Sequence, residues 1–295
     1  MITICSFGIS CCKFNISEVQ NPFMPKKESD LYIPQKVIVP EMVKVTGGII
    51  EGADYPWAPP KGNFPKGRLV QLSDFAIGKY EVTQEEYYSV MKDEVVSVTA
   101  YVDGVGERTA EFFMDSRPSF CKPNNPPYHC FEGENQERRP VEGITFYDAL
   151  WYCNVLSRKT DLEPVYKIKV TEVTSVNFSS HITDAEVEMI PGANGYRLPT
   201  LCEAEYAMRG GDPNAPDWDY LFSGAVSEPG RERYSINKGL DPVGWYQYNN
   251  KTGVSGTSDS DRENNTYYSY QGTHEVGLKK PNRLGLYDMS GNVSE

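Results

Sequence analysis

The sequence has no apolar run of about 18 residues, the length that an ordinary transmembrane helix needs. Basic side chains are also fewer than acidic ones. The chain has 29 Lys and Arg and 41 Asp and Glu, and its formal net charge is -12. A surface of that sign repels phosphate backbones. We therefore expect neither a transmembrane segment nor a nucleic-acid partner.

Metal-binding and nucleophilic side chains are sparse as well. The three histidines, His129, His181 and His274, are scattered in segments expected to be loops and offer no metal triad or nucleophile–base pair. The seven cysteines lack CxxC spacing, so they predict no zinc site. Cys121 and Cys130 share a loop rich in Pro and Asn. A disulfide in an exported protein, free thiols and buried thiols all remain open there.

The chain begins without clear periodicity. Its first twelve residues are apolar but lack the basic start of a secretory signal, so they are either a damaged export or lipoprotein signal or an irregular start. Residues 13–40 mix Asn, Pro, Lys and Glu. We expect residues 1–40 to be a poorly ordered leader and residues 41–295 to form one domain. Export or cell-envelope association follows only if the leader is a damaged signal.

Short strands and turns dominate the composition of the rest. Residues 42–45 predict a strand ending in a glycine turn, and residues 69–77 predict a further pair of strands. Twenty Tyr and 25 Gly spread through short segments fit a loop-rich mixed fold better than a helical bundle or a doubly wound sheet. Residues 92–135 predict a long insertion rich in loops, and residues 167–190 predict an inserted hairpin.

Three helices share a start signal. Thr83, Thr145 and Thr200 are each followed three residues later by Glu or Asp, the pattern of a capping box. The third helix is expected to end near Arg209, before two glycines. The second shows apolar residues at spacings of three and four, which predicts one buried face: Phe146, Ala149, Leu150, Cys153 and Leu156. Buried thiols on such helices, Cys153 and Cys202, behave as small hydrophobes.

Four segments follow one another in a recognisable order. They are Phe75–Thr83, Arg139–Thr145 with the helix after it, Gly195–Gly211 and Gly285–Val293. Together they resemble the motifs of the sulfatase-modifying-factor, or formylglycine-generating-enzyme, domain family over about residues 42–295. The resemblance implies an α+β fold of the C-type-lectin-like kind, loop-rich with little regular secondary structure.

Individual residues in these motifs carry narrower expectations. Arg197 is expected to be a buried ion-pair or carbonyl-binding residue before a capped helix, a purely structural role. Ala204 stands where members of the family usually carry Trp, which implies a locally altered core. Two tyrosine-rich stretches, residues 246–250 and 267–270, are expected to pack or to contact solvent, with recognition loops as the alternative.

The resemblance also bears on metals. Formylglycine-generating members use copper held by two cysteines downstream of the glycine–asparagine motif, and copper(I) needs soft thiolates. No cysteine pair occupies that part of the pattern here, so we expect neither bound copper nor catalysis by this chain alone. The resemblance does imply a calcium ion bound by hard oxygen ligands at Asp288, Gly291, Val293 and Glu295.

Relatives in the family continue with further core strands past this point. We therefore expect a domain that is incomplete at the C-terminus, with unpaired strand edges, exposed apolar surface and marginal stability. The leading hypothesis is a non-catalytic, lectin-like binding or structural module of bacterial origin that binds an unknown protein or small ligand. The alternative is part of a formylglycine-generating oxidase that converts a sulfatase cysteine to formylglycine. A plain structural domain fused to or partnering an envelope protein is a third interpretation.

Overall fold

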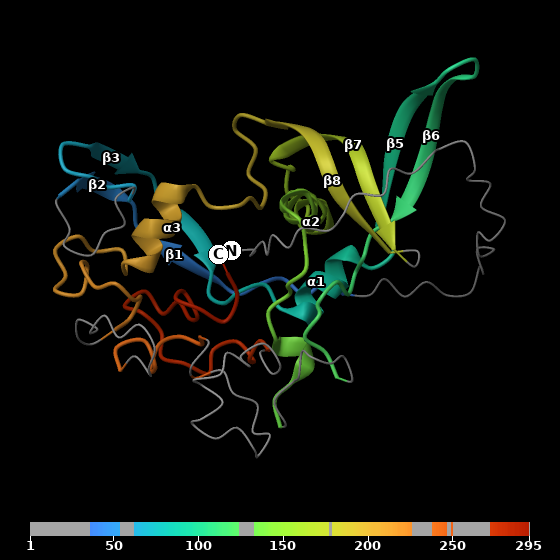
Figure 1. Ribbon diagram of the computed structural model, residues 1–295. Helices are drawn as coiled ribbons and strands as arrows, with labels where there is room; N and C mark the ends of the chain where they lie inside the picture. Colours follow the sequence, from blue (N-terminus) through green and yellow to red (C-terminus); the bar gives the residue numbers. More distant parts are fainter. Residues whose placement is uncertain are drawn as a thin grey trace, which may run out of the picture.

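A computed structural model describes residues 36–53, 62–123, 133–176, 179–225, 238–246, 249 and 272–294. Within these residues short strands and a few helices form a mixed α+β structure (Figure 1). No helix among them is both long and apolar enough to cross a bilayer. Most of the predicted leader lies outside the described residues, as do Cys5, Cys11, Cys12, Cys130, His129, Glu295 and Tyr267–Tyr270.

The described strands pair in antiparallel twos. The pairs are β1 (Met42–Val45) with β4 (Phe75–Gly78), β2 (Gly48–Glu51) with β3 (Leu69–Leu72), β5 (Val95–Val102) with β6 (Gly106–Phe113), and β7 (Tyr166–Val176) with β8 (Ser179–Met189). Both strands predicted in residues 69–77 are present as β3 and β4. They do not pair with each other, because each forms its ladder with an earlier strand.

The helices begin where the sequence predicts. They are α1 (Gln84–Met91), the 3-10 helix η2 (Gln136–Arg138), α2 (Phe146–Lys159) and α3 (Leu201–Met208). All three predicted capping boxes are formed, with the threonine hydroxyl accepting from the third residue of the helix. Helix α3 is followed by Gly210 and Gly211, both at positive φ, as predicted.

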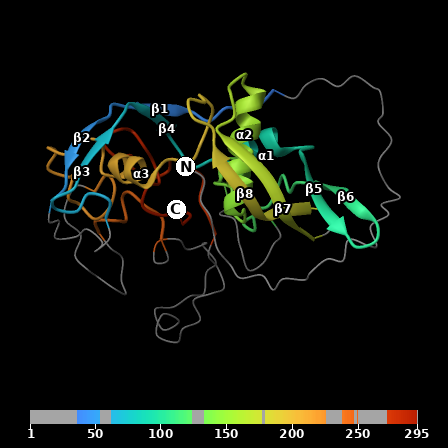
Figure 2. The same cartoon turned by 90° about the horizontal axis from the view of Figure 1, so that it is seen from above.

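Two clusters of buried apolar side chains divide the described residues into two lobes (Figures 1 and 2). The helical lobe comprises α1, α2 and the hairpins β5–β6 and β7–β8, around residues such as Tyr87, Leu150 and Ile182. The loop lobe comprises β1–β4, α3 and the segments 210–225 and 272–294, around Val45, Ile50, Tyr206, Trp218 and Leu286. Helix α2 buries most of its predicted face, although Phe146 is 46% exposed.

The hairpins correct two expectations and confirm one. Residues 92–135, predicted to be rich in loops, contain the regular hairpin β5–β6, in which Val96 and Val98 are buried on either side of the exposed Ser97. That alternation is the usual signal of a half-buried strand. The hairpin predicted at residues 167–190 is confirmed as β7–β8, and His181 lies on β8 rather than in a loop. The status of both segments as insertions stays a prediction.

Candidate functional site

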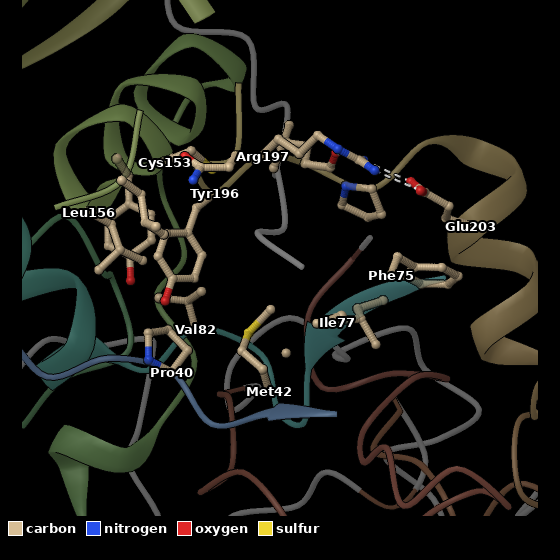
Figure 3. Close-up of a pocket in the computed structure, with 18 of the residues that line it drawn as sticks. Pro40, Met42, Phe75, Ile77, Val82, Cys153, Leu156, Tyr196, Arg197 and Glu203 are labelled. Carbon is tan, nitrogen blue, oxygen red and sulfur yellow. Dashed lines mark hydrogen bonds and ion pairs between the residues drawn. The ribbon is translucent and has the colours of Figure 1, made fainter. Parts of the chain in front are cut away.

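A cavity of about 460 Å³ lies between the two lobes. Strands β1 and β4 form its wall on the side of the loop lobe, while α2 and residues 193–199 form the opposite wall. Figure 3 shows the side chains gathered around it. Most of them are apolar, among them Met42, Phe75, Ile77, Val82, Leu156 and Leu198. The cavity therefore suits a ligand that presents apolar groups.

Arg197 lines this cavity and makes both the ion pair and the carbonyl contact that the sequence predicted. Its guanidinium donates to both carboxylate oxygens of Glu203, at 2.8 and 2.7 Å, and to the carbonyl of Leu198 at 3.0 Å. The predicted burial of Arg197 is wrong, because its side chain is 33% exposed. Burial opposes ionisation of Glu203, but the hydrogen bond from Arg197 holds the pKa of this carboxyl below its ordinary value. The two charges therefore neutralise each other at the cavity wall.

The backbone of the segment that carries Arg197 is bonded to side chains of α2 and β7. A side chain at Gly195 would overlap Ser157, so only glycine lets the segment approach the end of the helix this closely. The hydroxyl of Ser157 accepts from the N–H of Tyr196 at 2.8 Å. The hydroxyl of Tyr166 accepts from the N–H of Leu198 at 3.0 Å. The motif thus forms one rigid wall of the cavity.

Strand β4 presents an unpaired backbone edge. The N–H of Lys79 donates to the carbonyl of Glu41 at 2.8 Å, and the β1–β4 register continues from that pair. Because bonded and non-bonded pairs alternate in an antiparallel ladder, Ile77 bonds to β1 while the N–H and C=O groups of Ala76 and Gly78 point away from it. Within the described residues these groups make no hydrogen bond.

This edge borders the cavity. Every residue from Asp74 to Gly78 lines it, although successive side chains of a strand point to opposite faces. The cavity therefore reaches the backbone of β4, including that of Ala76 and Gly78. Free main-chain donors and acceptors therefore lie beside the apolar lining.

The predicted calcium motif lies in the loop lobe, away from this cavity's lining. Asp288 is buried, and its Oδ2 accepts from the N–H of Gly277 at 2.7 Å. Its Oδ1 is buried and has no hydrogen-bond partner in the described residues. Burial raises the pKa of Asp288 to about 6, opposed by the Gly277 bond and by the charge of Lys279.

The other predicted ligands are described in part. Gly291 has φ 140°, and a Cβ there would overlap the carbonyl of Trp245. The carbonyl oxygens of Gly291 and Val293 accept no hydrogen bond from any described residue. Glu295 lies outside the described residues. Oδ1 of Asp288 and the carbonyl oxygens of Gly291 and Val293 thus accept no hydrogen bond from the described residues, and hard oxygens of this kind fit the donor set of a calcium ion.

A buried polar network around His274 was missed by the sequence analysis. Arg139 is fully buried and pairs with Glu134 at 2.9 Å, and the other oxygen of Glu134 lies 2.7 Å from Nδ1 of His274. The His274 ring stacks on Trp245 with centroids 3.6 Å apart, and the backbone N–H of His274 donates to Asn292 at 2.8 Å. Burial lowers the pKa of His274 despite its bond to Glu134. No local spacing connects these residues, so no motif in the sequence announces them.

Among the described cysteines, Cys153 and Cys202 are free thiols, and Cys121 is buried. Burial raises the pKa of Cys153 to about 12, so it is a protonated thiol packed in α2, as predicted. Cys202 packs against the apolar cluster of the loop lobe but is only partly buried, which corrects the expectation of a buried residue. Among the described residues no group of three His, Cys, Asp or Glu is placed to hold a metal ion.

The sequence of residues 28–295 matches the family described as Sulfatase-modifying factor enzyme 1-like domain. The chain belongs to this family. One relative, the Chaperone protein LppX of Paenibacillus barcinonensis, is 36% identical over 77% of this chain and 62% of its own length. Another, the Formylglycine-generating enzyme of Thermomonospora curvata, is 27% identical over 89% of this chain and 72% of its own length. The chain therefore spans less than two thirds of the chaperone relative.

Two solved structures are similar in part. A crystal structure of CarF covers 86% of this chain and 77% of its own, at 22% identity and a TM-score of 0.49. The Treponema denticola variable protein 1 covers 86% of this chain and 75% of its own, at 26% identity and a TM-score of 0.48. Family membership rests on the sequence match.

Proposed function

We propose that this chain is a non-catalytic binding member of the family, built on a lectin-like scaffold, and that its ligand is another polypeptide. The observation that carries the proposal is the apolar cavity bordered by the open edge of β4, which offers main-chain hydrogen bonds beside apolar contacts. The 36% identical relative named a chaperone supports a protein ligand.

The state of the thiols supports a non-catalytic role. A thiol with a pKa of about 12, as in Cys153, stays protonated at neutral pH and serves neither as a nucleophile nor as a copper(I) ligand. Cys121 is buried, and its sulfur lies 3.9 Å from the carbonyl of Thr273. These cysteines act as packing residues.

Suppression of aggregation tests the proposal. Reduced, unfolded lysozyme is diluted with and without this chain while light scattering is followed, and we expect the chain to slow aggregation. Met42 lines the cavity and is 38% exposed, so Met42→Asp places a charge there without disturbing the core. Met189, 62% exposed and absent from the cavity lining, gives the matched control Met189→Asp. If both variants suppress aggregation equally, the cavity is not the binding site. If the wild type does not suppress aggregation, the proposed function is overturned.

The formylglycine-generating relative favours the alternative, an oxidase that converts a sulfatase cysteine to formylglycine. A synthetic peptide with the sulfatase cysteine is incubated with the chain, copper and oxygen, and its mass is measured. We expect the peptide to be recovered with its cysteine intact. Conversion of that cysteine to an aldehyde would contradict the non-catalytic proposal.

We also propose that Asp288, Gly291 and Val293, together with Glu295, bind calcium. The buried Oδ1 of Asp288, which has no hydrogen-bond partner among the described residues, supports this, since a buried polar atom without a partner is costly. Calcium at a hundredfold excess over its Kd should stabilise the fold by about 2.7 kcal/mol, seen as a rise in Tm. Asp288→Asn should abolish that rise, and magnesium at equal concentration is the control. If calcium does not raise the Tm of the wild type, the proposed calcium site is refuted.

A further inference from the structure

We propose that β4 binds an extended, uncharged segment of a client polypeptide as an added strand, with alternate side chains of that segment entering the cavity. This mode of binding rests on the proposed function and names its structural basis. Three features support it: the free main-chain groups of β4, the apolar side chains beside them, and the poor fit of other ligands to both.

The main chain of β4 has the groups that a new strand needs. Ala76 and Gly78 direct their N–H and C=O groups away from β1, and they are separated by one residue, the repeat at which an added strand forms its bonds. Neither residue has a side chain large enough to cover the edge. The outer edge of β1, the other side of this small sheet, carries Lys44 in the equivalent register, and an edge lysine discourages pairing.

The cavity accounts for side-chain recognition. Successive side chains of a bound strand point to opposite faces, so every second one can be directed toward Ile77, Val82 and Leu156. These lining residues are apolar, and the charges of Arg197 and Glu203 are engaged with each other. A segment with apolar residues at alternate positions and no charge at the strand centre fits this surface.

An extended peptide explains both features at once. A sugar needs convergent polar side chains, and most of the lining is apolar. A lipid chain would fill the apolar space but leave the donors and acceptors of Ala76 and Gly78 unpaired, which is costly away from water. Only the main chain of another extended segment presents donors and acceptors at the spacing of the outward N–H and C=O groups of Ala76 and Gly78.

The test uses a fluorescent peptide of alternating valine and threonine, followed by anisotropy with the full chain. Ala76→Pro removes one outward donor without breaking the bonds to β1, and Lys44→Pro removes the equivalent donor on the opposite edge. We expect Ala76→Pro to raise the Kd about fivefold and Lys44→Pro to leave it unchanged. A peptide of the same sequence with N-methyl groups at alternate residues cannot donate along one edge. It should bind the wild-type chain about as weakly as the unmethylated peptide binds the Ala76→Pro variant.

Each outcome separates this inference from the proposed function. Binding of reduced lysozyme by the wild type, with the peptide bound equally by both proline variants, would overturn strand addition and keep the chaperone-like function. If the wild type neither suppresses lysozyme aggregation nor binds the peptide, both the proposed function and strand addition are overturned. If the circular-dichroism signal shows that Ala76→Pro does not fold, Ala76→Lys replaces it in the test. This variant keeps the main-chain donor but adds a charge at the edge, and it must still weaken binding of the peptide. Concentration-dependent dimers abolished by these variants would assign the edge to a second copy and refute a client strand.

Discussion

The helical lobe and the loop lobe bury their cores by different means. In the helical lobe, α2 lays one apolar face against two hairpins, and most main-chain groups are paired within those elements. In the loop lobe, residues 272–294 contain no helix or strand, and scattered main-chain bonds and side-chain bonds together hold their main chain. The buried Asn282 donates to the carbonyl of Ala207 at 2.8 Å and accepts from the N–H of Leu284 at 3.0 Å.

The difference shows where single residues matter most. A core made of many apolar contacts loses stability in proportion to the area removed, and neighbouring side chains partly compensate. A loop without a repeating ladder of main-chain bonds depends more on individual asparagines and tightly packed glycines, and neighbouring residues compensate less for their loss. Substitutions that remove no apolar surface should therefore affect the loop lobe more than the helical lobe.

The strongest test is Gly291→Ala. The new Cβ would overlap the carbonyl of Trp245 and φ is positive, so we expect a loss of about 3 kcal/mol from overpacking and backbone strain. Gly192 is the matched control, because it also has positive φ but a Cβ added there would meet no atom within 4 Å, and Gly192→Ala should cost about 1 kcal/mol. Urea unfolding followed by tryptophan fluorescence measures both. Equal losses would show that the Trp245 contact is dispensable.

The helical lobe also contains buried polar links, and Asn154 forms one that is comparable. Asn154 on α2 donates to the carbonyl of Tyr166 at 2.6 Å and accepts from the N–H of the same residue at 3.1 Å, which fixes the start of β7. Asn154→Ala leaves both groups buried without partners, and we expect a loss of about 2 kcal/mol in urea unfolding. A loss larger than that of Gly291→Ala would reverse the comparison between the lobes.

A buried carboxyl before α2 should make stability depend on pH. Glu142 accepts from the N–H of Cys121 at 2.8 Å, and burial raises its pKa from 4.5 to about 6. Since the folded pKa lies above the unfolded one, the protonated group stabilises the fold at low pH, and this contribution is lost as pH rises from about 4.5 to about 6. Between pH 4.5 and 7 the wild type should lose about 2 kcal/mol relative to Glu142→Gln in urea unfolding. A difference independent of pH would refute this.

The smallest effect is expected between the lobes. Arg197 is a third exposed, so its ion pair with Glu203 is screened by solvent, and Arg197→Ala should cost less than about 1 kcal/mol. Thermal unfolding at low and high salt measures the loss and its electrostatic part. A cost as large as that of Asn154→Ala would mean that this pair, rather than the buried contacts, joins the two lobes.

Local patterns in the sequence predicted the helices and the family. A threonine and an acid three residues apart meet within one turn, so the caps at Thr83, Thr145 and Thr200 could be predicted without tertiary information. The buried face of α2 and the hairpin at residues 167–190 follow from periodicity for the same reason. The motifs around Arg197 and Asp288 led to the family that the sequence match establishes.

The tertiary structure alone decided the candidate site. Asn292 reaches Glu81 across 211 residues, and Arg139, Glu134 and His274 meet from distant segments, so no spacing announces them. The open edge of β4 depends on which strand pairs with it and in which register, since a shift of one residue would turn the main-chain groups of Ala76 toward β1. Sequence determines which residues can form a strand, while packing determines which of its edges stays open.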